Sequence, residues 1–346
     1  MGKIRILHIL GIDDTDKVRV VFLSPDPYRL RHQYTGNVEV GSLIDPDEFE
    51  VVQVICGGVA SEPVTVGEIH VVLNAVCDPD TNKKTLAIVS RVQQQFGMPA
   101  INNPDRVLGT VRDAVPGALA GQPGLRVPNT ARIQPMYRAD VPAMAEAAGI
   151  GMPYLVREAG THGGTNLTLV DANTALDELD RFPFDGRDFY VTEFVDFRSP
   201  DRLYRKYRVL VIGGVPIARH MIALENWNIH VEDRRALMEV SPDLQHEEEQ
   251  FLRGFSPNRF PVFQVLAAKL GLDYFGVDFA IDELGNAIVF ETNCCFRAIV
   301  DEASVSKIPY HQELIANIKA AFADLIRARA AQASATRAQA AFTPSL

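Results

Sequence analysis

Two carboxylates and a carboxamide late in the chain, Asp278, Glu291 and Asn293, have the types and spacing of metal ligands. They lie on two segments of alternating apolar residues around a turn at Leu284-Gly285, which predicts a β-hairpin. A turn centred there places Asp278 directly opposite Glu291, with Asn293 on the same face. Opposed carboxylates repel by roughly a few kcal/mol at an effective dielectric of about 20. Because oxygen ligands suit Mg²⁺, the sequence predicts a magnesium site, which Mn²⁺ could also occupy.

A second hairpin, predicted around the Gly213-Gly214 turn, carries two arginines. A two-residue turn would place Arg208 opposite Arg219 on one face. Like charges there are unfavourable unless an anion lies between them or acidic side chains neutralise them. A clamp on a phosphate or carboxylate is the functional interpretation. Two exposed arginines reaching water is the alternative.

A glycine-rich loop follows Arg157 and contains His162, Gly163 and Gly164. Glycines let a backbone approach an anion closely and direct N–H groups at it, and Arg157 could reach the same anion. An ordinary turn is the alternative. His162 could be a substrate-binding or acid–base group, or a surface residue.

Glu193 ends an apolar strand where two lobes should join. Its carboxylate could accept the amino group of an adenine, while the backbone of Phe194 and Val195 pairs with the ring. Asp201, a little further on, could bind a ribose hydroxyl. A salt bridge between lobes is an equally good interpretation of Glu193.

Composition sets the class of protein. The chain has 346 residues, of which 47% are hydrophobic and 23% charged, as in an ordinary globular enzyme of two or three lobes. A net charge of −10 argues against a general nucleic-acid surface. The sequence has no apolar run of transmembrane length and no signal peptide, and its four cysteines form no CxxC pair. We therefore expect a cytoplasmic protein without a membrane anchor.

The elements that position these residues fall into four segments: residues 1–125, 126–195, 196–330 and 331–346. The first alternates strands and helices, which predicts an α/β lobe with a parallel sheet. Its strands are expected at Ile4–Leu10, Val18–Leu23, Val51–Cys56, Ile69–Val76 and Met98–Ile101, and its helices at Lys84–Phe96 and from Asn103, as cap, towards Val115.

The second segment predicts a small lobe and the third a larger lobe that holds both hairpins. Helices are expected at Val141–Ala148 (capped by Asp140), Ala172–Arg181, Val262–Leu270 and Tyr310–Arg329. The fourth segment, rich in Ala, Gln, Ser and Thr, is expected to be a disordered tail.

With these motifs in place, the sequence resembles the ATP-grasp superfamily over nearly its whole length. Gly276-Val-Asp278-Phe with Phe290-Glu291-Thr-Asn293 is similar to that family's metal signature, and Arg208-Val-Leu-Val-Ile-Gly213 to its phosphate-contacting strand. Pro153-Tyr-Leu-Val-Arg157 looks like the strand of the second ATP lysine. The loop Arg-Glu-Ala-Gly-Thr-His-Gly-Gly, with Trp227-Asn-Ile-His230, resembles a poorly characterised branch of the family.

The resemblance implies a Rossmann-like lobe followed by a two-lobed ATP-grasp domain, with ATP and Mg²⁺ as cofactors. It implies an ADP-forming ligase that activates a carboxylate as an acyl phosphate. Arg112 and Arg157 stand where the two ATP lysines are usual, which changes the phosphate geometry. Trp227, His230 and Arg297 are candidates for substrate binding, with small-molecule or peptide carboxylates and amines as substrates and a homodimer as a possible assembly.

Two alternatives remain open at this point. The chain could be a nucleotide-binding pseudoenzyme with a regulatory role, since the usual lysines are absent. It could also be an ATP-grasp kinase that transfers phosphate without ligation.

Overall fold

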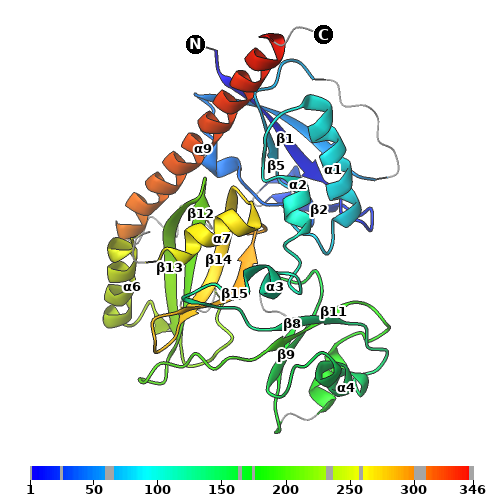
Figure 1. Ribbon diagram of the computed structural model, residues 1–346, viewed down its shortest axis with the longest axis vertical. Helices are drawn as coiled ribbons and strands as arrows, with labels where there is room; N and C mark the ends of the chain where they lie inside the picture. Colours follow the sequence, from blue (N-terminus) through cyan, green and yellow to red (C-terminus); the bar gives the residue numbers. More distant parts are fainter. Residues whose placement is uncertain are drawn as a thin grey trace.

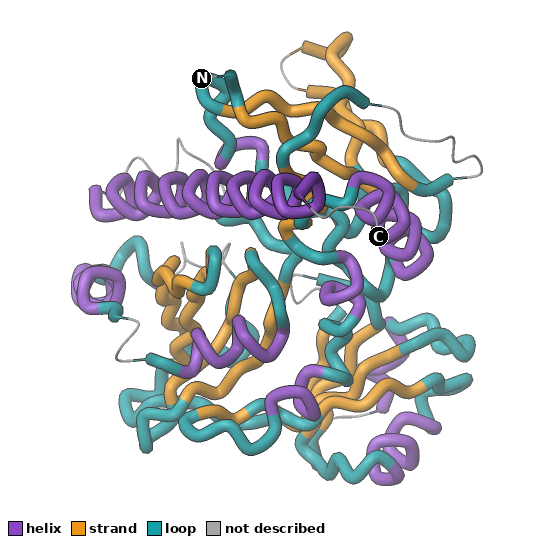
Figure 2. The backbone as a smooth tube through the Cα atoms, turned by 45° about the horizontal axis from the view of Figure 1, so that its top comes forward, coloured by secondary structure: helices purple, strands orange, loops and turns teal. Residues whose placement is uncertain are grey.

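The computed structural model describes residues 2–23, 26–58, 66–162, 166–173, 176–230, 237–256, 260–299 and 309–342. The described chain forms three lobes, each with its own main β-sheet (Figure 1). Helix α9 (Pro309–Phe342) runs along the large and N-terminal lobes (Figure 1, Figure 2). The small lobe lies at the end of the molecule opposite the N-terminal lobe (Figure 1). Parallel and antiparallel sheets with helices confirm the predicted α/β class. None of the described helices is both long and apolar enough to cross a bilayer.

The N-terminal lobe has the predicted parallel sheet, in the order β4-β1-β5-β6. Its elements are β1 (Ile4–Gly11), β4 (Phe49–Cys56), β5 (Val71–Asn74), β6 (Ala100–Ile101), α1 (Lys83–Phe96) and the short 3-10 helix η1 (Gly41–Leu43). In β1, Ile6, Leu7 and Ile9 are buried, as expected of a strand with both faces covered. The predicted strand near Val18 is β2 (Arg19–Leu23), but it pairs with β3 (Asp26–Gln33) in a separate hairpin.

The connection out of this lobe differs from the prediction. Asn103 does cap a helix, because its side chain accepts hydrogen bonds from two first-turn amides. That helix, α2 (Pro104–Leu108), is followed directly by Gly109 and so ends well before Val115. A separate short helix, α3 (Val115–Leu119), begins later. Arg112 therefore stands on a turn between two helices rather than on a helix.

The small lobe is an antiparallel sheet in the order β10-β9-β11-β8. Its elements are β8 (Thr130–Ile133), α4 (Asp140–Ala147), β9 (Tyr154–Glu158), β10 (Leu167–Val170), the 3-10 helix η2 (Leu176–Arg181) and β11 (Phe189–Glu193). Asp140 lies inside the first turn of α4, where it accepts hydrogen bonds from the amides of Met136 and Tyr137, and Ala139 is the cap. The helix predicted from Ala172 is the shorter η2.

The large lobe holds the two predicted hairpins in one sheet, in the order β13-β12-β14-β15-β7. Its elements are β7 (Leu125–Arg126), β12 (Tyr204–Ile212), β13 (Val215–Leu224), α6 (Pro242–Gly254), α7 (Val262–Leu270), β14 (Tyr274–Ile281) and β15 (Ala287–Asn293). The edge strand β7 belongs to this sheet and spans the predicted boundary between residues 125 and 126. The domain boundaries themselves stay a prediction.

Helix α9 was predicted to end at Arg329, with a disordered tail beyond it. In the structure it continues to Phe342, so the helix is longer than predicted. Alanine, which is abundant here, has the highest helix propensity and outweighs the low complexity of the segment. Arg329 pairs with Asp273 of the large lobe, and Arg327 with Glu48 of the N-terminal lobe at 2.6 Å. The helix thus ties these two lobes together.

Candidate active site

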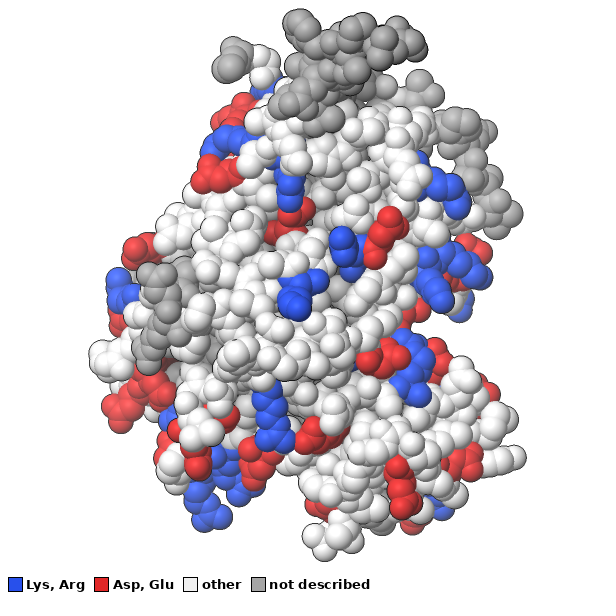
Figure 3. Space-filling view, viewed as in Figure 1, with Lys and Arg blue, Asp and Glu red and all other residues white. Residues whose placement is uncertain are grey.

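A cavity of about 710 Å³ lies where the three lobes meet. On the surface, charged side chains line both sides of the notch between the small lobe and the rest of the molecule (Figure 3). Most of the predicted site residues line the cavity: Arg112, Arg157, His162, Glu193, Phe194, Val195, Arg208, Arg219, Trp227, His230, Asp278, Glu291, Asn293 and Arg297. Gly163 and Gly164 lie outside the described residues.

The predicted opposition of two carboxylates is confirmed, since Asp278 pairs with Glu291 across β14 and β15. The register shifts immediately beyond this pair, which leaves Phe290 as the extra residue of β15. The pair itself belongs to the same register as Gly276, which lies opposite Asn293. Both carboxylates therefore face the same side of the sheet, as a shared ligand requires.

Asp278 is buried, at 6% exposure, and is bound by two cations. The Arg208 guanidinium donates to both carboxylate oxygens, with Nη2 at 2.7 Å from Oδ2. The Lys206 ammonium lies 3.7 Å from the same Oδ2. Burial alone would raise the pKa of Asp278, but Arg208 and Lys206 outweigh burial and lower it.

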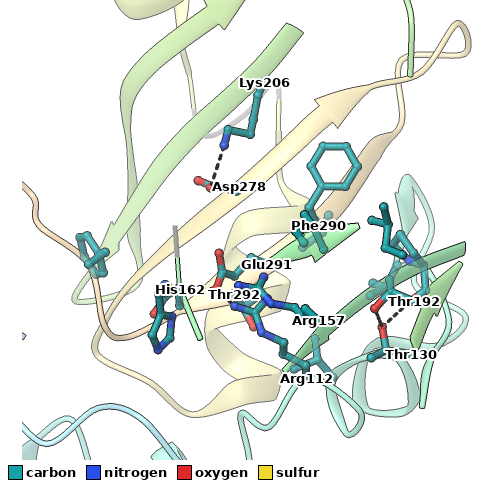
Figure 4. Close-up of a pocket in the computed structure, with 18 of the residues that line it drawn as sticks. Arg112, Thr130, Arg157, His162, Thr192, Lys206, Asp278, Phe290, Glu291 and Thr292 are labelled. Carbon is teal, nitrogen blue, oxygen red and sulfur yellow. Dashed lines mark hydrogen bonds and ion pairs between the residues drawn. The ribbon is translucent and has the colours of Figure 1, made fainter. Parts of the chain in front are cut away.

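Glu291 has partners from other parts of the chain (Figure 4). Arg112 forms an ion pair with Oε1, and the Asn293 amide donates to the same oxygen at 3.2 Å. Burial and the opposed Asp278 would raise the pKa of Glu291. The Arg112 guanidinium, helped by His162 and Arg157, outweighs them and lowers it. Glu291 is therefore held ionised.

These contacts bear on whether the residues fit a magnesium ion. Two carboxylates and a carboxamide are the donors that a hard cation takes. Arg112 and Asn293 both contact Oε1 of Glu291, and Oε2 accepts no hydrogen bond from the described residues. In contrast, both oxygens of Asp278 are bound to Arg208. No set of three His, Cys, Asp or Glu side chains in the described part of the chain is arranged around a metal position. These oxygen donors fit Mg²⁺ once the Arg208 guanidinium moves away from the Asp278 carboxylate.

The two arginines of the other hairpin are not opposite one another, contrary to the prediction. A register shift between Arg208 and Val209 places Arg208 opposite His220. Arg219 is the extra residue of the bulge, and its Nε donates to the carbonyl of Ala298 at 2.6 Å. Both arginines still line the cavity. Burial, then Arg208 and Arg219, lower the pKa of His220, which keeps its imidazole neutral.

Arg157 points from β9 towards Glu291 and lies close to Arg112 (Figure 4). Its Nη2 donates to the carbonyl of Thr161 at 2.6 Å. Its Nε is buried and has no hydrogen-bond partner among the described residues. Burial, followed by the neighbouring Arg112, lowers the pKa of Arg157 to about 10. A partly buried guanidinium with a buried, unused Nε–H beside a second guanidinium is an anion-binding arrangement.

His162 is held by a carboxylate of the N-terminal lobe. Its Nε2 lies 3.0 Å from Oδ2 of Asp78, which is only 3% exposed. Burial would lower the pKa of His162, but the hydrogen bond to Asp78 and the charge of Glu291 raise it. Against burial, His162 likewise lowers the pKa of Asp78. The histidine is therefore biased towards its charged form inside the cavity.

Solved structures share this architecture over nearly the whole chain. An ATP-grasp RimK domain protein from Sphaerobacter thermophilus superposes with a TM-score of 0.53, at 17% identity, over 93% of this chain and 99% of that one. D-alanyl-alanine synthetase A from Vibrio cholerae gives 0.53 at 12% identity over 96% and 99%. The VanG D-Ala:D-Ser ligase from Enterococcus faecalis gives 0.51 at 13% identity over 94% and 100%. The chain has the ATP-grasp fold. No family model and no curated protein matches the sequence.

The ATP-grasp fold confirms the predicted Rossmann-like lobe followed by a two-lobed domain. At its lobe junction, Glu193 accepts hydrogen bonds from Arg126 at 2.7 Å and from the amide of Asn129. Since Arg126 is on β7 of the large-lobe sheet, this contact is the interlobe salt bridge given as the alternative for Glu193. Phe194 and Val195 line the cavity beside it.

The remaining predictions divide between cavity and surface. Asp201 does not line the cavity, and its exposed carboxylate pairs with Arg205 at 2.6 Å, so the structure does not bring it to the site. Trp227 lines the cavity and packs edge-on against Phe194, with ring centroids 5.7 Å apart. Arg297 lines the cavity mouth, is mostly exposed, and lies 3.6 Å from Glu39.

Sequence reasoning missed three charged groups that line the cavity, Lys206, Asp78 and Asp80. Lys206 is two residues before Arg208 on β12, so the two-residue period of a strand could have placed both on one face. Asp78 follows β5 closely, and ligand sites of parallel sheets lie beyond the carboxyl ends of their strands. Both signals were present in the sequence.

Proposed function

We propose that this protein is an ATP- and Mg²⁺-dependent ligase that activates a carboxylate as an acyl phosphate and joins it to an amine or another nucleophile. The observation that carries the proposal is the excess of positive charge around the Asp278–Glu291 pair. The cationic side chains that line this part of the cavity are Arg112, Arg157, Lys206, Arg208 and Arg219. Like charges held together in a partly buried site are unfavourable, and a polyphosphate would relieve them.

In this proposal Arg112 and Arg157 bind the β- and γ-phosphates, where the buried Nε of Arg157 gains a partner. Arg208 and Arg219 hold the transferred phosphoryl group and the acyl-phosphate oxygens. Asp278, Glu291 and Asn293 would hold Mg²⁺, which when bound neutralises charge on the phosphates. The adenine would lie against Phe194 and Val195.

The chemistry takes place in two transfers. A carboxylate oxygen of the acid attacks the γ-phosphorus, and the bond from that phosphorus to the bridging oxygen of ADP breaks. The nucleophile then attacks the carbonyl carbon of the acyl phosphate, and phosphate leaves with the electrons of the carbon–oxygen bond. The amine proton goes to the departing phosphate or to water. Exclusion of water by the small lobe protects the acyl phosphate.

For the substrates we propose small-molecule or peptide carboxylates and amines. Trp227, His230 and Arg297 line the same cavity as the arginines. The guanidinium of Arg297 suits a substrate carboxylate, since it presents a planar pair of donors.

The test is a screen of ADP release against candidate acids, each with and without amino acids or peptides as nucleophiles. Ligation predicts that ADP release needs both an acid and a nucleophile, and that the product mass equals their sum less one water. ADP release that needs only one acceptor would indicate a kinase instead.

One observation favours a second candidate, a pseudoenzyme that binds nucleotide without turnover. Arg112 and Arg208 are ion-paired with the very carboxylates that would bind Mg²⁺. Binding of ATP with equal affinity in the presence and absence of Mg²⁺, and no ADP release with any pair of substrates, would support this candidate.

A further inference from the structure

A short segment of the N-terminal lobe, residues 78–82 between β5 and α1, contacts the small lobe at several points. We call it the latch segment. Asp78 binds His162 at 3.0 Å. Asp80 accepts hydrogen bonds from Arg132 at 2.7 Å and from the hydroxyl of Tyr190 at 2.8 and 2.9 Å. These contacts join two lobes that are far apart in the sequence.

The contact is closely fitted as well as charged. A Cβ added at Gly160 of the small lobe would lie 2.6 Å from the Thr81 methyl carbon, so the glycine is needed for the approach. Its φ of +73° independently favours glycine. Asp78 also accepts a hydrogen bond from the amide of Asp80 at 2.8 Å, which fixes the shape of the latch segment itself.

The strand register connects these contacts to the phosphate site. Tyr190 on β11 lies directly opposite Arg132 on β8, and on its other side directly opposite Arg157 on β9. Directly opposed residues of antiparallel strands share a face, so the three side chains form one row across the small-lobe sheet. Asp80 binds two members of this row, and Arg157 is the third.

We propose that Asp80 is a positioning residue that sets the place of Arg157, and with it the closed position of the small lobe over the cavity, through Tyr190 and Arg132. The proposal rests on the proposed function only in taking ATP phosphates to be the ligand of Arg157. Tyr190 is suited to the task because burial, and then Asp80, raise the pKa of its hydroxyl, which stays protonated as a donor. Arg132 also binds Asp188 of its own lobe at 2.6 Å, so it couples the latch segment to the β8–β11 pair.

The experiment uses Asp80→Asn and Arg132→Gln in the full-length protein, with Arg138→Gln as the matched control. Arg138 is also an arginine of the small lobe with two carboxylate partners, Asp177 and Asp180, but both are on its own lobe. ATP affinity is measured by the fluorescence of Trp227, the single tryptophan, which lines the cavity. Amide hydrogen exchange of β8, β11 and the latch segment is measured without nucleotide.

We expect each of the two variants to weaken ATP binding about tenfold and to speed exchange in these segments, while the control changes neither by more than about twofold. The double variant should lose little more than either single one, because both remove the same contact. Tyr190→Phe, which removes only the hydroxyl, should give a smaller loss in a folded protein and serves if the charge variants unfold.

Unchanged exchange and unchanged ATP affinity in Asp80→Asn and Tyr190→Phe would overturn the proposal, as would equal effects in Arg138→Gln. The two hypotheses fail separately. If the wild type binds no ATP, the proposed function is wrong, while the exchange rates still decide whether Asp80 holds the small lobe.

Discussion

Arg157→Met tests whether the cavity is built for an anion, because the two possible roles of Arg157 predict stability changes of opposite sign. The variant removes the partly buried charge and keeps a long, flexible side chain. Burial and Arg112 lower the pKa of Arg157 to about 10, so the folded state disfavours the protonated form relative to the unfolded state. Since neutral pH lies below both pKa values, the guanidinium is charged in both states and this destabilisation is fully present at pH 7.

The expected size follows from that lowered pKa. It corresponds to about 3 kcal/mol of destabilisation by the charged side chain. The variant also loses the hydrogen bond to the Thr161 carbonyl, which contributes about 1 kcal/mol. We therefore expect Arg157→Met to be more stable than the wild type by about 2 kcal/mol without nucleotide.

The assay is urea unfolding followed by Trp227 fluorescence, with and without ATP. At a hundredfold excess over its Kd, ATP should stabilise the wild type by about 2.7 kcal/mol. Arg157→Met should lose most of this effect, because its ATP affinity falls. Arg187→Met removes an exposed arginine of the same lobe and should change neither measurement.

The reasoning is refuted if Arg157→Met is less stable than the wild type without nucleotide, which would make Arg157 a structural residue. It is equally refuted if ATP stabilises variant and wild type alike. Only an anion-binding role predicts both a gain of stability and a loss of ligand response.

Three further predictions concern the carboxylates and the histidine. Glu291→Gln should abolish ADP release with an unchanged circular dichroism spectrum. Unchanged ATP consumption in this variant would contradict the role of Glu291 as a metal ligand. Chelation of divalent cations should stop ADP release and added Mg²⁺ or Mn²⁺ should restore it, whereas activity in the chelator would contradict a metal at Asp278. Asp78→Asn should lower the pKa of His162, seen by NMR titration of its ring proton. The stabilisation by the Asp78–His162 pair is fully present below the ordinary histidine pKa and is lost as pH rises through the raised pKa of His162. The destabilisation by Asp78→Asn should therefore shrink at alkaline pH. A destabilisation that grows with pH would contradict the ion pair.

Part of the site could be predicted because it depends on local geometry. The sequence predicts the β14–β15 hairpin and the opposition of Asp278 and Glu291, but the turn alone does not set that pair. Next to the turn Ile281 lies opposite Ala287, and only the bulge at Phe290 brings Asp278 opposite Glu291. The same argument failed for Arg208 and Arg219. A bulge inserts one residue into β13 there, and the sequence of the turn carries no sign of it.

Partners that come from distant segments were beyond such reasoning. Arg112 reaches Glu291 only because the helix expected to extend to Val115 breaks and leaves a turn near the cavity. Asp80 meets Tyr190 only through the docking of two lobes. Strand periodicity fixes which face a residue occupies, but not which lobe will lie against it.

The structure also changes the argument for a metal. Repulsion between Asp278 and Glu291 predicted a cation, yet guanidinium groups already supply the positive charge. Repulsion alone therefore does not require Mg²⁺, and the case for the ion rests on the hard oxygen donors. If the ion and ATP bind together, phosphates can take over Arg208 and Arg112 while the ion takes the carboxylates. Such an exchange keeps Asp278, Glu291, Arg112 and Arg208 paired both before and after binding, which explains how one site can be stable by itself and still bind a strongly charged ligand. It also predicts that ATP and Mg²⁺ bind cooperatively, each weakly alone, because either one by itself leaves the arginines or the carboxylates without a partner.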